Sequence, residues 1–277
     1  MKYEYLTFDK ITKLADWWID ENVTRVVEIA ALEPLIWKDG NKNIVDVVKL
    51  LKDKDFTVTM TSNAAHLYKY AKLLKYAGLD LLRISWHSMD DNIYKLVTGG
   101  GKLEKLLAGL DAAIAEDLNI SINRVLMRGY TSDLIEHIAY IDRHGLRLKL
   151  LDLYWTPDSA KDYDNYYISP QEVLNEFVQL GLITLATDSI EKHGRKRVRY
   201  YTANGGIVEY KLQSSVNRHL ICESCIKKDN CLEGFGDYLR VFPECVVSLC
   251  YLRHDLGVSI FKDNDSISVP SDFMDVF

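Results

Sequence analysis

The residues of this chain with the clearest capacity for chemistry are its five cysteines, which all lie between Cys222 and Cys250. Their spacing is Cys222-x2-Cys225-x5-Cys231-x13-Cys245-x4-Cys250. A CxxC pair presents two neighbouring thiolates to one metal centre, and cysteines from later turns can complete a set of four ligands. This pattern predicts a metal site, and it leaves open whether the thiolates hold an iron–sulfur cluster or Zn²⁺.

The composition indicates a cytoplasmic protein. No stretch reaches the roughly 18 apolar residues of a membrane-spanning helix, and the N-terminus lacks the apolar core of a signal peptide. Clustered cysteines in a reducing compartment more often bind metal than form disulfides. The formal net charge of −6 lacks the basic surplus that is typical of nucleic-acid-binding proteins, so we expect no nucleic-acid partner and no membrane partner.

Upstream of the cysteines, helical and strand patterns alternate from residue 8 to residue 155. We predict strands, each separated from the next by a helix, at residues 23–30, 56–61, 79–86, 120–127 and 146–154. Such alternation predicts parallel strands that are joined by right-handed crossovers. The strands are almost continuously apolar, which predicts that both faces of the sheet are covered, as in a doubly wound sheet or a barrel.

In either fold, functional side chains gather where the parallel strands end. Polar residues stand at or near all five predicted strand ends: Glu33, Asn63, Ser85, His87, Asn123 and Asp152. Together they predict a binding cleft, without identifying its ligand. His87 is the candidate for acid–base work, because an unperturbed imidazole titrates near neutral pH. A rim histidine that is held by a hydrogen bond is the plainer alternative.

The pattern changes after residue 157. Residues 158–170 are polar and rich in tyrosine, which indicates a linker or a lid, and a short helix and a hairpin follow. We therefore divide the chain into a first domain at residues 1–157 and a second part at residues 158–277, which holds the linker, the hairpin and the cysteines. The basic run at residues 192–199 is interpreted as a solvated rim of the hairpin rather than as a phosphate contact.

The first domain contains the short runs EPLIWKD at residues 33–39, AGLD at 77–80, ISWHSMD at 84–90, VTGGG at 97–101 and INRVLMRG at 122–129. In order and spacing these runs resemble the GTP 3′,8-cyclase (MoaA) family of the radical S-adenosylmethionine (radical SAM) superfamily. The resemblance implies an α/β fold with an incomplete parallel (β/α) barrel of the radical SAM type. A small C-terminal α+β domain with an auxiliary, SPASM/twitch-like cluster would follow the barrel.

The same resemblance implies which cysteines are ligands. Cys222, Cys225, Cys231 and Cys250 are similar to the ligands of an auxiliary cluster, which implies one [4Fe–4S] cluster, with Zn²⁺ as the runner-up. Pro243-Glu244-Cys245 resembles a Pro-Asp-Gly turn, so Cys245 is expected not to be a ligand.

The chain departs from the family at the site for SAM. Family members carry CxxxCxxC after their first strand, where three thiolates hold the SAM-cleaving cluster, and here no cysteine precedes Cys222. The family's Gly-Gly-Glu-Pro loop reads Ala31-Leu32-Glu33-Pro34, and we expect Leu32 to exclude the left-handed backbone that glycine permits. These departures predict that SAM is not bound productively and that the polar rim is a remnant of the family's cleft.

Two functions remain open. In the first, the chain is a degenerate radical-SAM-like iron–sulfur protein that acts as a binding or partner subunit. Its partner would be an active radical SAM enzyme, a peptide or a small molecule, or a second copy across the open barrel edge at residues 23–30, because an exposed apolar edge is usually covered. In the second, the chain is an active enzyme, either through its remaining cluster or with an N-terminal motif missing from this chain.

Overall fold

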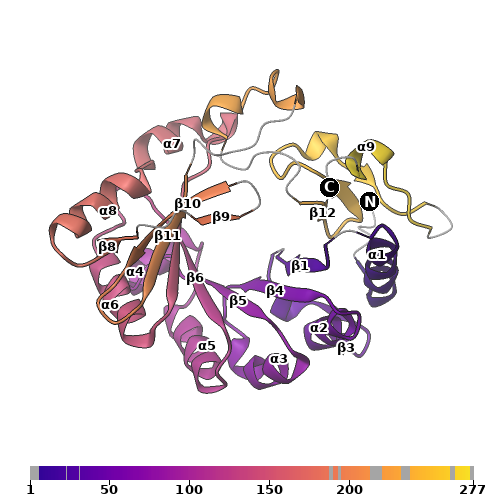
Figure 1. Cartoon of the computed structure of the whole chain (residues 1–277), viewed down its shortest axis with the longest axis horizontal. Helices are drawn as coiled ribbons and strands as arrows, with labels where there is room; N and C mark the ends of the chain where they lie inside the picture. The colour runs from indigo at the N-terminus through magenta and orange to yellow at the C-terminus, as the bar shows by residue number, and fades with distance from the viewer. Residues whose placement is uncertain are drawn as a thin grey trace.

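The computed structural model describes residues 6–22, 24–30, 32–186, 190–192, 195–212, 220–231, 238–262 and 266–274. These residues form one curled, mostly parallel sheet of nine strands with helices on its outer side (Figure 1). The strands run in the order β1-β4-β5-β6-β7-β11-β10-β8, and β9 pairs with β10. Their bounds are β1 (Val26–Ile29), β4 (Thr57–Ser62), β5 (Leu81–Ser85), β6 (Ile120–Val125), β7 (Arg147–Leu151), β8 (Thr184–Leu185), β9 (Ile190–Lys192), β10 (Arg195–Tyr201) and β11 (Ile207–Lys211).

Helices alternate with the first five strands of this sheet, and neighbouring strands there are parallel, which confirms the predicted α/β fold. The outward side chains of Val58, Leu82 and Ile122 are fully buried in the core. The helices are α1 (Phe8–Asp20), α2 (Ile44–Asp53), α3 (Ala71–Ala77), α4 (Asp91–Val97), α5 (Leu103–Ala115), α6 (Leu134–His144), α7 (Ala160–Tyr166) and α8 (Pro170–Gln179).

Local signals fix several helix ends. The Thr7 side chain accepts a hydrogen bond from the Lys10 N–H at 3.2 Å, so Thr7 caps α1. Gly78 and Gly145 end α3 and α6 in the left-handed conformation, with φ of 86° and 60°. The sequence predicts all three of these ends.

The apolar pattern of residues 64–77 predicts one helix, but α3 begins only at Ala71. The Ala64 N–H donates to Ser62 Oγ and the Ala65 N–H donates to Asn63 Oδ1, both at 2.9 Å. Side-chain hydrogen bonds of this kind compete with helix formation. The chain therefore passes through a 3₁₀ turn, Leu67–Lys69, before α3 begins.

The hairpin of β10 and β11 joins the main sheet. Strand β11 runs parallel to β7, with Glu209 beside Lys149. The hairpin thus belongs to the same sheet as the five parallel strands, and the division of the chain at residue 157 stays a prediction. Within the polar segment 158–170, the chain forms α7.

A small C-terminal unit packs on the N-terminal helix (Figure 1). Leu14 and Trp17 of α1 join a core with Val247 and Ile260. The remaining short elements are β2 (Lys38–Asp39), β3 (Lys42–Asn43), β12 (Arg240–Val241), β13 (Val246–Ser248), β14 (Val258–Ser259) and α9 (Ser271–Met274). Strands β12, β13 and β14 form an antiparallel sheet, which agrees with the predicted small α+β unit.

Strand β1 lies at the edge of the main sheet, as predicted. Among the described residues it pairs with β4 alone, and Val26 is 48% exposed. The barrel is therefore incomplete in this part of the chain. No helix among the described residues is long and apolar enough to cross a membrane.

Candidate functional site

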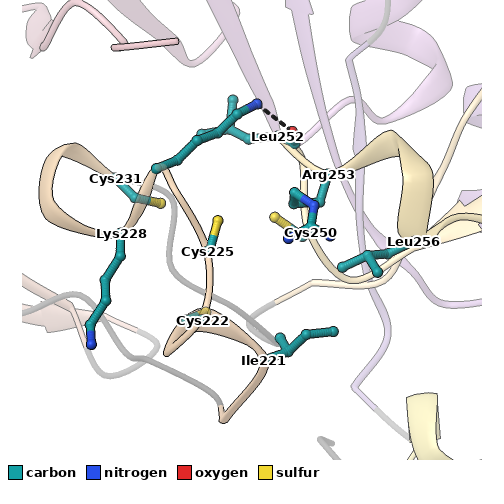
Figure 2. A pocket seen from close by; sticks show the side chains of 10 residues that line it. Ile221, Cys222, Cys225, Lys228, Cys231, Cys250, Leu252, Arg253 and Leu256 are labelled. Atoms are coloured by element: carbon teal, nitrogen blue, oxygen red, sulfur yellow. Dashed lines mark hydrogen bonds between the residues drawn. The ribbon is translucent and has the colours of Figure 1, made fainter. Parts of the chain in front are cut away.

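Four of the five cysteines line one pocket: Cys222, Cys225, Cys231 and Cys250 (Figure 2). The first three follow one another on tight turns. The Cys225 N–H donates to the Cys222 carbonyl at 3.2 Å, the Lys228 N–H to the Cys225 carbonyl at 3.0 Å, and the Cys231 N–H to the Lys228 carbonyl at 3.4 Å. Side chains three positions apart on such turns lie on the same side.

Cys250 enters the pocket from the chain after β13. Lys227 Nζ donates to the Leu252 carbonyl at 2.7 Å and so ties the two walls together. Burial raises the pKa of the Cys250 thiol, and the nearby Cys231 raises it further. Thiolates on the walls of one pocket repel one another unless a cation neutralises them.

Cys245 is not among the residues that line this pocket. Its N–H donates to the Phe242 carbonyl at 2.9 Å and its φ is 61°, so it occupies the position of a turn glycine. The residue is 4% exposed, and its sulfur lies 3.8 Å from Lys10 Nζ. The choice of ligands itself stays a prediction.

The donor set suits either a [4Fe–4S] cluster or a single Zn²⁺ ion. A [4Fe–4S] cluster takes four cysteine thiolates, and the four cysteines stand on the walls of a shared pocket. Among the described residues, no three His, Cys, Asp or Glu side chains are close enough to share one metal ion.

Glu33 fastens two loops of the barrel rim. Its carboxylate accepts hydrogen bonds from the Leu35 N–H at 3.0 Å, the Ser62 hydroxyl at 2.8 Å and the Asn63 N–H at 2.7 Å. The Glu33 side chain is buried, and both of its carboxylate oxygens accept hydrogen bonds from neighbouring residues of the chain. Asn63 likewise uses its Oδ1 on the Ala65 N–H. Ligand contacts by Glu33 and Asn63 stay predictions.

The expectation for Leu32 is wrong. Leu32 has a φ of 50° and is 95% exposed. The loop thus keeps a left-handed residue where the family has glycine, although a leucine adopts this conformation at an energetic cost. With its side chain in solvent, Leu32 meets no packing clash that would prevent the conformation.

Ser85 and Asn123 are neighbours on β5 and β6, and the same row continues through Lys149 on β7 and Glu209 on β11. Alternate strand residues share a face, so this row lies on the inner side of the sheet, opposite the apolar outer face. Asn123 is 9% exposed, and its Oδ1 has no hydrogen-bond partner among the described residues. That Ser85 and Asn123 face a ligand cleft together with Asn63, His87 and Asp152 stays a prediction.

The inner side of the sheet carries a basic cluster, formed by Lys149, Arg197 and Arg199, that the sequence analysis does not predict. Arg197 and Arg199 pair with the buried carboxylate of Glu209 at 2.7 and 3.2 Å. The interpretation of residues 192–199 as a solvated rim is therefore wrong for these two arginines. Arg197 and Arg199 are two positions apart in a strand, which places both side chains on the same face of the sheet and could have predicted the cluster.

Lys149 lies within this basic cluster. Burial, together with the charges of Lys211, Arg197 and Arg83, lowers its pKa to about 7. Glu28 opposes the shift. The ammonium of Lys149 is therefore partly deprotonated at neutral pH, and a bound anion would favour its protonation.

Asp152 follows β7, at the predicted rim. Burial raises its pKa to about 6, and the Tyr167 hydroxyl donates to its Oδ1 at 3.5 Å. Lys211 is close enough to oppose the rise. Asp152 therefore titrates in the range that the sequence analysis assigned to His87.

The expectation that His87 titrates near neutral pH is wrong. Its Nδ1 accepts the Val125 N–H at 3.2 Å. Burial lowers its pKa to about 4, and the charge of Arg124 adds to the shift. His87 is neutral at physiological pH, in line with the alternative of a rim histidine held by a hydrogen bond.

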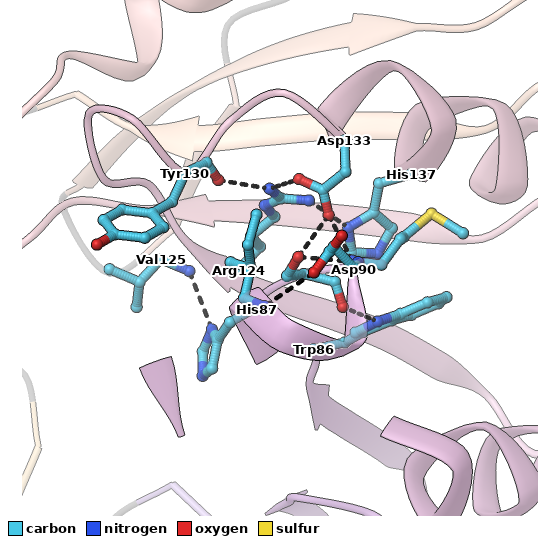
Figure 3. A network of polar contacts seen from close by, with 11 residues as sticks. Trp86, His87, Asp90, Arg124, Val125, Tyr130, Asp133 and His137 are labelled. Carbon is cyan, nitrogen blue, oxygen red and sulfur yellow. Dashed lines mark hydrogen bonds and ion pairs between the residues drawn. The ribbon is translucent and has the colours of Figure 1, made fainter. Parts of the chain in front are cut away.

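A buried network underlies this part of the rim (Figure 3). Arg124 is fully buried, donates to the Tyr130 carbonyl at 3.0 Å, pairs with Asp133, and lies 3.1 Å from His137 Nδ1. Asp133 accepts the Ser88 hydroxyl at 2.7 Å. Hydrogen bonds from Arg124 hold the pKa of Asp133 at about 2 despite its burial. The network joins the loops after β5 and β6.

Comparisons with known proteins agree with this architecture. The Radical SAM superfamily model matches residues 1–141. A GTP 3′,8-cyclase of Hydrogenovibrio crunogenus is 30% identical over 258 residues, which cover 91% of this chain and 72% of the relative. A probable GTP 3′,8-cyclase of Pyrococcus abyssi is 24% identical over 272 residues, with 93% and 82% covered.

Among solved structures, that of Streptococcus suis SuiB has a TM-score of 0.51 at 15% identity, and the match covers 62% of this chain and 40% of SuiB. This likeness shows the fold alone. From the family model and the cyclase relatives it follows that the chain belongs to the radical SAM superfamily, as a member of the GTP 3′,8-cyclase (MoaA) family.

Proposed function

We propose that this chain is the nucleotide-binding and auxiliary-cluster part of a GTP 3′,8-cyclase-type radical SAM system. The observation that carries the proposal is the inner face of the sheet, where Arg197 and Arg199 pair with the carboxylate of Glu209 and Lys149 lies beside it. Relatives that are named GTP 3′,8-cyclases support a nucleoside phosphate as the ligand class. Membership in the superfamily implies a [4Fe–4S] cluster and SAM as the family's cofactors.

Different residues of the barrel would contact different groups of the bound nucleotide. Phosphate oxygens pair well with guanidinium and ammonium groups, which Arg197, Arg199 and Lys149 supply. The orphan Oδ1 of Asn123 would accept a hydrogen bond from a ligand N–H or O–H group. Asp152 would hold or release a proton beside the ligand, since its pKa of about 6 lies near neutral.

The cysteine pocket would hold the cluster, which supplies one-electron chemistry when it is bound. Its ligands would be Cys222, Cys225, Cys231 and Cys250. The SAM-cleaving cluster does not fit this sequence, because its 277 residues contain no cysteine before Cys222. Reductive cleavage of SAM would need cysteines from outside this sequence.

Binding of GTP under anaerobic conditions tests the proposal. Replacing Lys149→Met removes one of the ligand's charged partners, and we expect the dissociation constant to rise about tenfold, which equals about 1.4 kcal/mol. The matched control is Lys161→Met at an exposed position of α7, which should bind GTP like the wild type. Isothermal titration calorimetry that finds no GTP binding to the wild type contradicts the proposal.

The partner-subunit function is a second candidate, favoured by the exposed edge of β1. In this case the chain alone forms no 5′-deoxyadenosine from SAM and dithionite, and a catalytic relative supplies the SAM-binding cluster. Mass-spectrometric detection of 5′-deoxyadenosine from the purified chain would instead support a self-contained enzyme.

A further inference from the structure

A buried lysine and a buried cysteine meet where α1 packs on the C-terminal unit. Lys10 is 8% exposed, and its Nζ lies 3.8 Å from Cys245 Sγ, although the two residues are 235 positions apart in the sequence. The same Nζ lies 5.1 Å from the centroid of the Phe261 ring. An amine and a thiol, which are both nucleophilic groups, therefore share one largely apolar site, and neither residue lines the cysteine pocket.

Backbone hydrogen bonds hold the two side chains next to each other. The Cys245 N–H donates to the Phe242 carbonyl, and the Cys245 carbonyl accepts the Ile260 N–H, both at 2.9 Å. The Leu6 N–H donates to the Pro243 carbonyl at 3.0 Å, so the chain just before α1 binds the same turn. The amine and the sulfur are thus brought together by the fold and need little movement to react with each other.

The surroundings favour oxidation of the Cys245 thiol in place. A neighbouring ammonium stabilises a thiolate, and the thiolate is the form that peroxides oxidise. Cys245 is 4% exposed, so hydrogen peroxide, which is hardly larger than water, reaches the sulfur more easily than a bulky second thiol does. The amine of Lys10 is then in position to attack the oxidised sulfur before a disulfide can form.

We propose that hydrogen peroxide links Cys245 to Lys10 through a sulfur–nitrogen bond, which forms a reversible lock between α1 and the C-terminal unit. In the first step the thiolate attacks one peroxide oxygen and the O–O bond breaks. The sulfur is oxidised to a sulfenic acid, and the released hydroxide takes a proton from the Lys10 ammonium and becomes water. In the second step the neutral amine attacks the sulfur, the S–N bond forms, and the sulfenic hydroxyl leaves with one amine proton as water.

The link has two consequences for the protein. It stops the oxidation of Cys245 at a stage that thiols reverse, since two thiol molecules restore the cysteine and the lysine and become one disulfide. It also ties α1 covalently to the unit of β13 and β14, which closes a long loop in the unfolded chain and so stabilises the folded one. The stability of this contact would therefore respond to peroxide, independently of the proposed function.

Peptide mapping of the full-length chain after treatment with hydrogen peroxide tests the proposal. The remaining thiols are blocked with iodoacetamide before digestion. We expect a joined pair of peptides that contain Lys10 and Cys245, with a mass two hydrogens below their sum, and we expect dithiothreitol to separate the pair. Absence of the joined pair, or a disulfide at Cys245 in its place, would overturn the proposal.

Two lysine variants separate the link from an effect of charge. Lys10→Arg keeps a positive charge beside the sulfur, but a guanidinium is a poor nucleophile. We therefore expect Cys245 in this variant to stop at the sulfenic acid, which dimedone labels, without a link. Lys13→Arg changes a lysine of the same helix whose side chain is 40% exposed, and it should form the link like the wild type.

Thermal unfolding gives a readout that does not depend on the recovery of peptides. We expect the difference in Tm between the wild type and Lys10→Arg to grow by about 5 °C after peroxide, because only the wild type closes the loop. The comparison cancels damage at the other cysteines, which both proteins carry. A difference in Tm that peroxide leaves unchanged would refute the lock.

Discussion

His87 lies at the end of β5 with its Nδ1 accepting the Val125 N–H. The bond leaves Nε2 as the protonated nitrogen of the neutral ring. Burial and the charge of Arg124 oppose a second proton, so the residue is a positioning group of the rim and no acid–base catalyst near pH 7. Asp152, whose pKa is raised to about 6, is the better proton-transfer candidate.

The low pKa of His87 predicts how stability depends on pH. The unfolded chain takes up the imidazole proton near pH 6.5, whereas the folded protein resists it until about pH 4. The folded state therefore loses roughly 3 kcal/mol from this group as the pH falls through that window, and keeps it above pH 6.5.

The His87→Asn variant isolates this effect, because asparagine can place an acceptor oxygen near the position of Nδ1. Urea unfolding of both proteins from pH 7 to pH 4 should show a smaller loss of stability in the variant. Equal slopes for the two proteins would contradict the assigned pKa.

At the scale of elements, the buried pair of Arg124 and Asp133 joins β6 to the start of α6. Asp133→Asn leaves the Arg124 charge buried without its counter-ion. Breaking such a pair costs about 3–5 kcal/mol. Urea unfolding should reveal this loss, whereas Asp164→Asn at an exposed position of α7 should change stability by less than about 0.5 kcal/mol. An unchanged free energy of unfolding in Asp133→Asn would show that the ion pair does not stabilise the contact between β6 and α6.

Local signals in the sequence predict where helices and strands lie, but not which distant strands pair with one another. The Thr7 cap and the glycine ends of α3 and α6 are correct, because short-range hydrogen bonds and backbone freedom decide them. The attachment of β11 to β7 escapes prediction, because pairing with a distant strand leaves little trace in a hairpin's own pattern. The left-handed backbone of Cys245 is a local property of the turn that contains it. The lowered pKa of His87 instead arises from burial and from the charge of Arg124, which only the complete fold brings about.

At the scale of the whole molecule, the curled sheet ends at β1, whose outer edge no strand among the described residues covers. If another chain adds a strand there, a lysine on the edge should prevent the contact. We expect Val26→Lys to convert an assembly of the wild-type protein into monomers in native mass spectrometry. Val178→Lys on α8, which is 37% exposed compared with 48% for Val26, is the matched control. A wild-type protein that stays monomeric would count against an edge-to-edge contact.

The account depends most directly on the metal content of the anaerobically purified chain. We predict about four irons and four acid-labile sulfides per chain, with loss of both in Cys225→Ser and retention in Cys245→Ser. Iron and sulfide analysis of the three proteins makes this measurement. Stoichiometric zinc in place of iron, or loss of the metal in Cys245→Ser with retention in Cys225→Ser, would contradict the account.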